Sequence, residues 1–249
     1  MNGTFSIHKR DFVWAQYGIV TTLLFLGLLL YIYQSFNGVD LYFRAFGVFD
    51  VDKEASVPTW FSAINLLLSA CLLLSIYAAS RERLDNGSRY WLFLGLVFLA
   101  LSIDEVAGFH ERAARLTEVT VLLFAGDVPS AIFQGPLRVL FGNWILPGII
   151  VCIVAFLFFL PFLRILPRRT AGLFLLAGAI YIGGALGFEI VGDWSYVNEI
   201  TQYGDFLDSI RILVEEAAEM FGIALFNCVL FGELTKEDQT LTIQIGATH

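Results

Sequence analysis

Acidic side chains and a histidine occur inside three long apolar stretches of this sequence. They lie in the runs LSIDEVAGFHER at 101–112, GFEIVGD at 187–193 and LDSIRILVEEAAEMFG at 207–222. Ionisable residues inside apolar stretches are costly to keep there, and they usually mark a binding site or an ion pathway. These three runs therefore hold the candidates for chemistry.

Several carboxylates held close together need a cation or shared protons between them, because like charges repel strongly where screening is poor. Oxygen ligands suit Ca²⁺, Mg²⁺ or Mn²⁺, and one added imidazole admits iron (Fe) or zinc (Zn). The sequence therefore predicts a divalent metal site and leaves the metal open. The predicted ligands are Asp104, His110, Glu189, Glu216 and Glu219, and the predicted surrounding residues are Asn65, Ser102, Glu105, Glu111, Asp193, Arg211 and Glu215.

Ordinary structural roles compete with this interpretation. Arg211 and Glu215 are four residues apart, which is the spacing of an ion pair on one face of a helix. Asp193, Asp208 and Glu111 lie near the ends of their apolar stretches, and we expect these three carboxylates to be in water.

The stretches that carry these residues are long enough to cross a membrane. The chain has 249 residues, of which 57% are hydrophobic and 15% charged, and its mean hydropathy is +0.73. A soluble domain has about 25% charged residues, whereas a membrane-spanning helix needs about 20 mostly apolar ones. We predict an all-α bundle that forms a single transmembrane domain over residues 1–249. The predicted spans are 12–34, 58–79, 90–112, 139–163, 169–192 and 207–232.

Lys and Arg are distributed unevenly among the connections between these spans. If the N-terminus is cytoplasmic, nine of them lie inside, five lie outside, and Arg211 falls in the sixth span. Cytoplasmic loops carry the excess of positive charge, so we predict that both termini are inside. The acids then lie in the outer half of the bilayer, with Asp104 roughly 12 Å below the outer end of its span at about 1.5 Å per residue.

Two outer connections are longer than simple turns. Residues 36–50 combine aromatic and polar side chains in a way that predicts an amphipathic segment at the membrane interface. Residues 113–138 form either an interfacial helix or a re-entrant element. In the fifth span, small residues favour a close approach of helices, and these are Gly183, Gly184, Ala185 and Gly187.

Five motifs in the second half of the chain resemble those of a group of uncharacterised bacterial multi-span membrane proteins. They are LSIDEVAGFHE, WILPG at 144–148, FLRILPRR at 162–169, GGALGFE at 183–189 and EEAAEMFG at 215–222. The resemblance implies a multi-pass protein of the bacterial inner membrane, and it brings no assigned activity or ligand.

Three classes of function follow from these residues. The first is a metal-dependent membrane enzyme that acts on a lipid-like substrate, with a carboxylate as general base. The second is a cation or proton transporter that uses the same acids as a relay. The third is a non-catalytic assembly or binding protein. Membrane lipids are the expected partners, whereas the net charge of -8 argues against nucleic acid.

Overall fold

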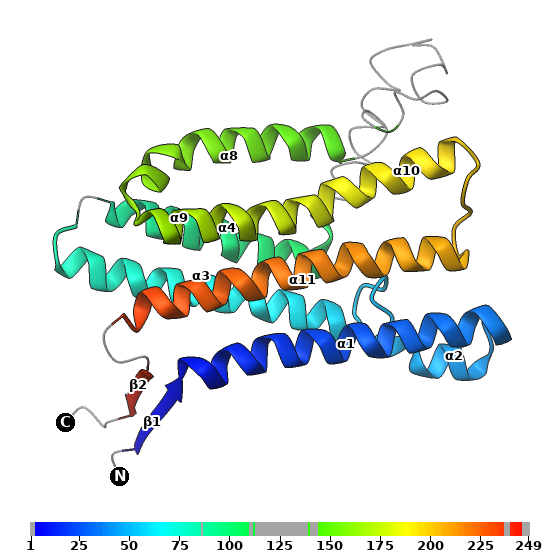
Figure 1. The fold of residues 1–249 in the computed structure, drawn as a ribbon, viewed down its shortest axis with the longest axis horizontal. Helices are drawn as coiled ribbons and strands as arrows, with labels where there is room; N and C mark the ends of the chain where they lie inside the picture. The colour runs from blue at the N-terminus through cyan, green and yellow to red at the C-terminus, as the bar shows by residue number, and fades with distance from the viewer. Residues whose placement is uncertain are drawn as a thin grey trace.

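Six long helices lie side by side in the computed structural model of this chain (Figure 1). It describes residues 3–85, 87–109, 112, 139, 144–236 and 240–245. Within these ranges, six helical segments are long and apolar enough to cross a membrane, which confirms the predicted six-span helical architecture and indicates a multi-pass membrane protein. The segments are α1 (Lys9–Asn37), α3 (Val57–Glu82), α4 (Ser88–Ala107), α8 (Ile145–Ile165), the continuous stretch Arg168–Val197, and α11 (Phe206–Leu234).

The fifth span changes its helical type part-way along. It begins as α9 (Arg168–Ile182), passes through the π-helical turn η2 (Gly183–Phe188) and ends as α10 (Glu189–Val197). A π-helical turn closes its hydrogen bonds one residue later than an α-helical turn, and such turns are frequent at functional sites.

Two glycines bring this span against α11. A Cβ atom at Gly184 would lie 2.9 Å from the carbonyl oxygen of Glu215, and one at Gly222 would lie 2.8 Å from a backbone nitrogen of α9. Such backbone contact confirms for Gly184 the close approach that the small residues predict. A Cβ atom at Gly183 or Gly187 would have nothing within 4 Å, so these two glycines make no such contact.

The predicted outer end of the third span is wrong. α4 ends at Ala107 because Gly108 adopts a left-handed backbone with φ 56°, which is a common way to terminate a helix. Asp104 is therefore only about 4.5 Å from the end of its helix, at about 1.5 Å per residue. The connection 113–138 lies outside the described residues, so both alternatives for it stay predictions.

A short helix forms within the predicted interfacial segment. α2 (Leu41–Phe46) is followed by the 3₁₀ turn η1 (Gly47–Phe49), and Asp40 caps α2 by accepting a hydrogen bond from the Phe43 N–H at 2.8 Å. This bond and one from the Tyr33 hydroxyl lower the pKa of Asp40. The apolar side chains of Leu41 and Phe46 are exposed whereas Phe43 is buried, as expected for an element that lies along a membrane interface.

A two-stranded sheet, absent from the prediction, joins the two ends of the chain. β1 (Gly3–His8) pairs antiparallel with β2 (Thr240–Ile245), with His8 opposite Thr240. Both ends therefore lie at the same end of the bundle (Figure 1). This agrees with an even number of spans.

Helix α11 is the centre of the bundle. It packs against α1, α3 and α9, while α4 packs against α3. The main apolar core lies where these helices meet α8, and it includes the almost fully buried Leu73, Phe162 and Leu230. This arrangement fixes the position of every acid on α11 relative to the three helices that pack against it.

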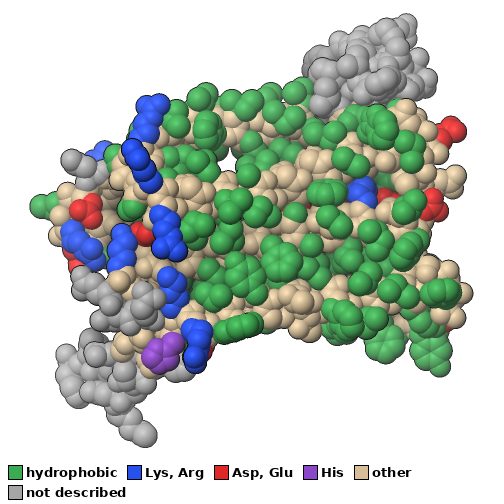
Figure 2. Space-filling model, viewed as in Figure 1, with side chains coloured by type: hydrophobic (Ala, Val, Ile, Leu, Met, Phe, Trp, Pro, Cys, Tyr) green, Lys and Arg blue, Asp and Glu red, His purple; other side chains and the backbone are tan. Residues whose placement is uncertain are grey.

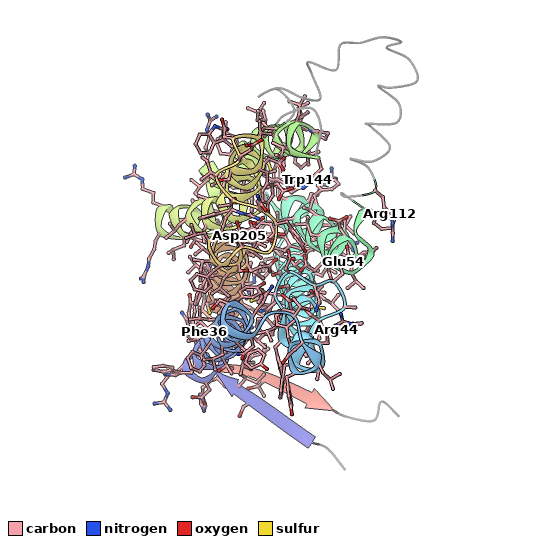
Figure 3. The ribbon with its side chains drawn as sticks, turned by 90° about the vertical axis from the view of Figure 1, so that its right-hand side faces the viewer. Phe36, Arg44, Glu54, Arg112, Trp144 and Asp205 are labelled. Carbon is pink, nitrogen blue, oxygen red and sulfur yellow. The ribbon has the colours of Figure 1, made fainter. Side chains whose placement is uncertain are left out.

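The two ends of the bundle differ in charge. Most of the basic side chains visible in Figure 2 gather at the end that carries the termini. Figure 3 looks onto the opposite end, where Phe36, Arg44, Glu54, Arg112, Trp144 and Asp205 are labelled. The nine basic residues on the segments at the first end are Lys9, Arg10, Arg81, Arg83, Arg89, Arg164, Arg168, Arg169 and Lys236.

Candidate functional site

Acids of two helices interact electrostatically with one tyrosine. Tyr181, near the end of α9, interacts electrostatically with Glu219, Glu105, Glu216 and Asp104. Glu219 and Glu216 lie on α11. Glu105 and Asp104 lie in the last turn of α4. Acids of the third and sixth spans therefore interact with the same residue, and their convergence in one carboxylate cluster stays a prediction.

Glu216 and Glu219 lie on the same face of α11, and both are half-buried. Glu219 interacts electrostatically with Glu216, Glu105, Glu215 and Glu189, so α10 also contributes a carboxylate to this region. Among the residues that the structure describes, neither Glu216 nor Glu219 has a hydrogen-bond or ion-pair partner.

The depth of these acids follows from a hydrogen bond between α3 and α4. The hydroxyl group of Ser102, a buried residue, donates to the carbonyl oxygen of Ala63 at 2.8 Å. Ala63 is six residues from the start of α3, so the last turn of α4 lies level with the first turns of α3. The two acids of α4, Asp104 and Glu105, therefore lie near the end of the bundle opposite the termini, closer to that end than the sequence predicts for Asp104.

The predicted metal site is not assembled by the described residues. No three His, Cys, Asp or Glu side chains in the described ranges form a group that fits one metal ion. His110 and Glu111 lie outside those ranges, so the divalent metal stays a prediction. The other predicted ligands lie on three helices, with Asp104 on α4, Glu189 at the first position of α10, and Glu216 and Glu219 on α11.

Arg211 is held between two carboxylates of its own helix. Its Nε and Nη2 each lie 3.1 Å from Asp208 Oδ1, and its Nη1 lies 2.6 Å from Glu215 Oε2. Nη1 also donates to the carbonyl oxygen of Phe188 at 3.3 Å, which ties α11 to the end of η2. The predicted pairing of Arg211 with Glu215 is confirmed.

The expectation that Asp208 is in water is wrong. Its side chain is 0% exposed, and it accepts hydrogen bonds from the Tyr196 hydroxyl at 2.7 Å and the Gly204 N–H at 3.3 Å. The chain turns back over Asp208 at Gly204, where φ is 87°. A sequence signal was present, because Asp208 precedes Arg211 by three residues, the other same-face spacing on a helix.

The backbone of α10 makes room for this network. A Cβ atom at Gly192 would lie only 2.7 Å from Arg211 Cζ, so the guanidinium group packs directly on the helix backbone. Asp193, the next residue, is half-buried rather than fully in water.

Two loops at the end of the bundle opposite the termini meet beside the Arg211 network. The Tyr203 hydroxyl donates to Asp52 Oδ2 at 2.9 Å, and the Asp52 carboxylate raises the pKa of Tyr203 to about 12, which keeps the phenol protonated. Asp52 also interacts electrostatically with Asp208 and Arg211. Below it, the Tyr31 hydroxyl donates to the Asp50 carboxylate at 2.9 Å. This loop therefore joins α1 to the connection before α11.

Asn65 belongs to a separate polar contact deeper in the bundle. Asn227 Nδ2 donates to the carbonyl oxygen and to the side-chain oxygen of Asn65, at 3.1 and 3.2 Å, and the Ser69 hydroxyl donates to Asn227 Oδ1 at 2.6 Å. Asn227 lies eight residues inward of Glu219 on α11, or about 12 Å along the helix axis. Asn65 therefore serves the packing of α3 on α11 and lies away from the acids.

An apolar cavity of about 480 Å³ lies between α4, α8, α9 and α11. On α8 it extends from Val151 to Leu163, which is about 18 Å at 1.5 Å per residue. Its lining is apolar except for Tyr181 and Cys152. The surface is hollowed between α8 and α9 (Figure 2), so the cavity is open towards the side of the bundle.

The end of this cavity farther from the termini approaches the helical turns that carry the acids. Gly222 lines the cavity on α11, and Glu219 lies one helical turn closer to the start of that helix. Leu101 lines it on α4, and Asp104 follows three residues later. Tyr181 belongs to both regions, because it lines the cavity and interacts with the acids.

Sequence comparison assigns a family to the chain but no activity. No curated protein and no solved structure matches it. Residues 18–234 match the family described as a domain of unknown function, DUF8692, and since this match covers most of the sequence, the chain belongs to that family.

Proposed function

We propose that this protein binds a lipid-like substrate inside the membrane, with the substrate's chain in the apolar cavity and its polar end at the carboxylates. The observation that carries the proposal is the position of Tyr181, which lines the cavity and also interacts electrostatically with the acids. The cavity volume of about 480 Å³ lies within the range of roughly 300–1,000 Å³ that is usual for sites of small organic ligands. An opening between α8 and α9 gives a lipid a lateral entry from the bilayer.

The carboxylates give this site the means to act on its ligand. A carboxylate beside a bound polar group serves as a general base when the two are within hydrogen-bond reach. A divalent metal completed by His110 stays part of the proposal as the sequence predicts it. The transporter alternative has less support, because the cavity inward of the acids is lined by apolar side chains that cannot relay protons.

Filling the cavity should release the ligand. Gly178 lines the cavity and has nothing within 4 Å of its Cβ position, so Gly178→Phe places a ring in the open space. The ring occupies space that the ligand needs, so we expect a loss of affinity of roughly tenfold or more, which corresponds to about 1.4 kcal/mol or more. Mass spectrometry of lipids retained by the protein, purified in mild detergent, measures this loss.

Gly172→Phe is the matched control. Gly172 lies on the same helix, also with nothing within 4 Å, and it does not line the cavity. Equal lipid retention in the two variants would contradict the proposed location of the ligand.

The proposal places the acids on the outer side of the membrane, with both termini in the cytoplasm. The gathering of basic side chains at the end that carries the termini supports this orientation. In a variant without the three native cysteines, Val39→Cys and Ile200→Cys should react with an impermeant maleimide in intact cells. Leu84→Cys, which is also exposed, should react only after lysis. The reverse pattern would overturn the orientation.

A further inference from the structure

We propose that a second cavity, at the end of the bundle that carries the termini, binds the head group of an anionic phospholipid, with Arg83 as the cation that receives its phosphate. This site lies apart from the acids of α4 and α11, and it goes beyond the proposed function. The lining of the cavity, its charged residues and the charge of that end of the bundle support the proposal.

The second cavity has a volume of about 580 Å³ and lies where α3, α8 and α11 end and α4 begins. Its apolar lining includes Ile76, Trp91 and Phe162, which are buried residues of the main core, and Phe162 also lines the apolar cavity. Its polar lining includes the hydroxyl groups of Ser80, Ser88, Thr235 and Thr240. Such a lining suits the part of a phospholipid where the polar head joins the acyl chains, because it offers both hydrogen bonds and apolar contact.

The charged residues in the described lining are Arg83, Lys236, Asp85 and Glu233. Glu233 accepts a hydrogen bond from the Thr170 hydroxyl at 2.8 Å and pairs with Lys236 Nζ at 2.6 Å, so its charge is compensated. Arg83 is exposed, and it forms no ion pair with any residue that the structure describes. A guanidinium group is always protonated and offers five N–H donors in a planar arrangement that fits a phosphate.

The surroundings of the cavity are basic. The nine basic residues named above lie on the segments at this end, whereas the acids on the described part of the same segments are Asp11, Glu82, Asp85 and Glu233. Basic pockets between membrane helices attract the head groups of anionic lipids, and each Lys or Arg near the surface adds to the attraction. The positive charge therefore favours a lipid with a net negative head over a zwitterionic lipid, whose ammonium group it repels.

Two phospholipids with the same short acyl chains test the head group. We expect the purified protein, in mild detergent, to bind phosphatidylglycerol about fivefold or more tightly than phosphatidylcholine. Inorganic phosphate should bind far more weakly than phosphatidylglycerol, because it has no chains for the apolar lining. Native mass spectrometry titrations give the lipid affinities, and competition by phosphate gives the third.

Two substitutions with opposite effects test the charges of the cavity. Arg83→Gln should lower the affinity for phosphatidylglycerol about fivefold, whereas Asp85→Asn should raise it, because a negative charge beside the phosphate is removed. Arg169→Gln is the matched control, since Arg169 is exposed at the same end of the bundle and does not line the cavity. It should leave the affinity close to that of the unsubstituted protein.

Several results would overturn the proposal. Equal binding of the two lipids removes the anionic head group, and phosphate that competes at the affinity of the lipid shows that the ligand is a free anion. A similar loss in Arg83→Gln and Arg169→Gln shows general surface charge in place of a site. A loss in Asp85→Asn shows that the ligand is a cation. None of these results affects the proposed function, because neither Arg83 nor Asp85 lines the apolar cavity.

Discussion

Replacing Arg211 with methionine is expected to lower the free energy of unfolding by about 3–5 kcal/mol, the cost of leaving a buried charge without its partner. Asp208 would lose the two guanidinium contacts at 3.1 Å while its side chain stays fully buried. Glu215 would lose its contact at 2.6 Å. The change should appear as a large fall in melting temperature, measured on the protein in mild detergent.

A double variant shows whether the uncompensated charge is the cause. Asp208→Asn combined with Arg211→Met removes both buried charges, and it should recover much of the lost stability, because an amide still accepts the hydrogen bond from the Tyr196 hydroxyl. A double variant that is as unstable as the sum of its two single variants would show that the pair does not act as a unit.

Gly222→Val is expected to be the second severe change, because it forces α9 away from α11. The new Cβ atom would lie 2.8 Å from the Tyr181 backbone nitrogen and 3.0 Å from the Ala177 carbonyl oxygen. Backbone atoms cannot rotate away as a flexible side chain can, so the helices must separate. Overpacking of this kind costs about 1–3 kcal/mol and occasionally more. Thermal unfolding in the same detergent measures the loss.

Gly172→Val is the control for the intrinsic effect of valine in a membrane helix. Its position has nothing within 4 Å, so the variant should unfold near the temperature of the unsubstituted protein. Similar melting temperatures for the two variants would contradict the close contact between α9 and α11.

Features that depend on a long run of residues could be predicted from the sequence. Each span contributes about twenty apolar residues to the signal, so its existence is robust even where its ends are not. The end of α4, in contrast, is set by one residue, Gly108, which adopts a left-handed backbone conformation. A hydropathy pattern contains no information on such a local conformation. Because α4 ends at Ala107, Asp104 lies in the last turn of its helix and not, as the sequence predicts, in the interior.

The candidate site was predictable in part for a similar reason. Acids at comparable depth on neighbouring helices are expected to converge, and Glu219 does interact electrostatically with Glu105 and Glu216, but no metal-binding group forms among the described residues. The burial of Asp208 depends on how the preceding loop folds over it, which a span boundary does not reveal. The cavity was also hidden, because its apolar lining looks in sequence like any other lipid-facing surface.

The π-helical turn η2 has a consequence for the angular phase of the fifth span. Each residue of an α-helix advances the side-chain direction by about 100°, so one extra residue in a turn rotates all that follows by that amount. α9 can thus direct Tyr181 towards the cavity while α10 directs Gly192 towards Arg211. With an uninterrupted α-helix, one of these two alignments would be lost. The two halves of the fifth span therefore share one continuous axis but present different faces to their neighbours.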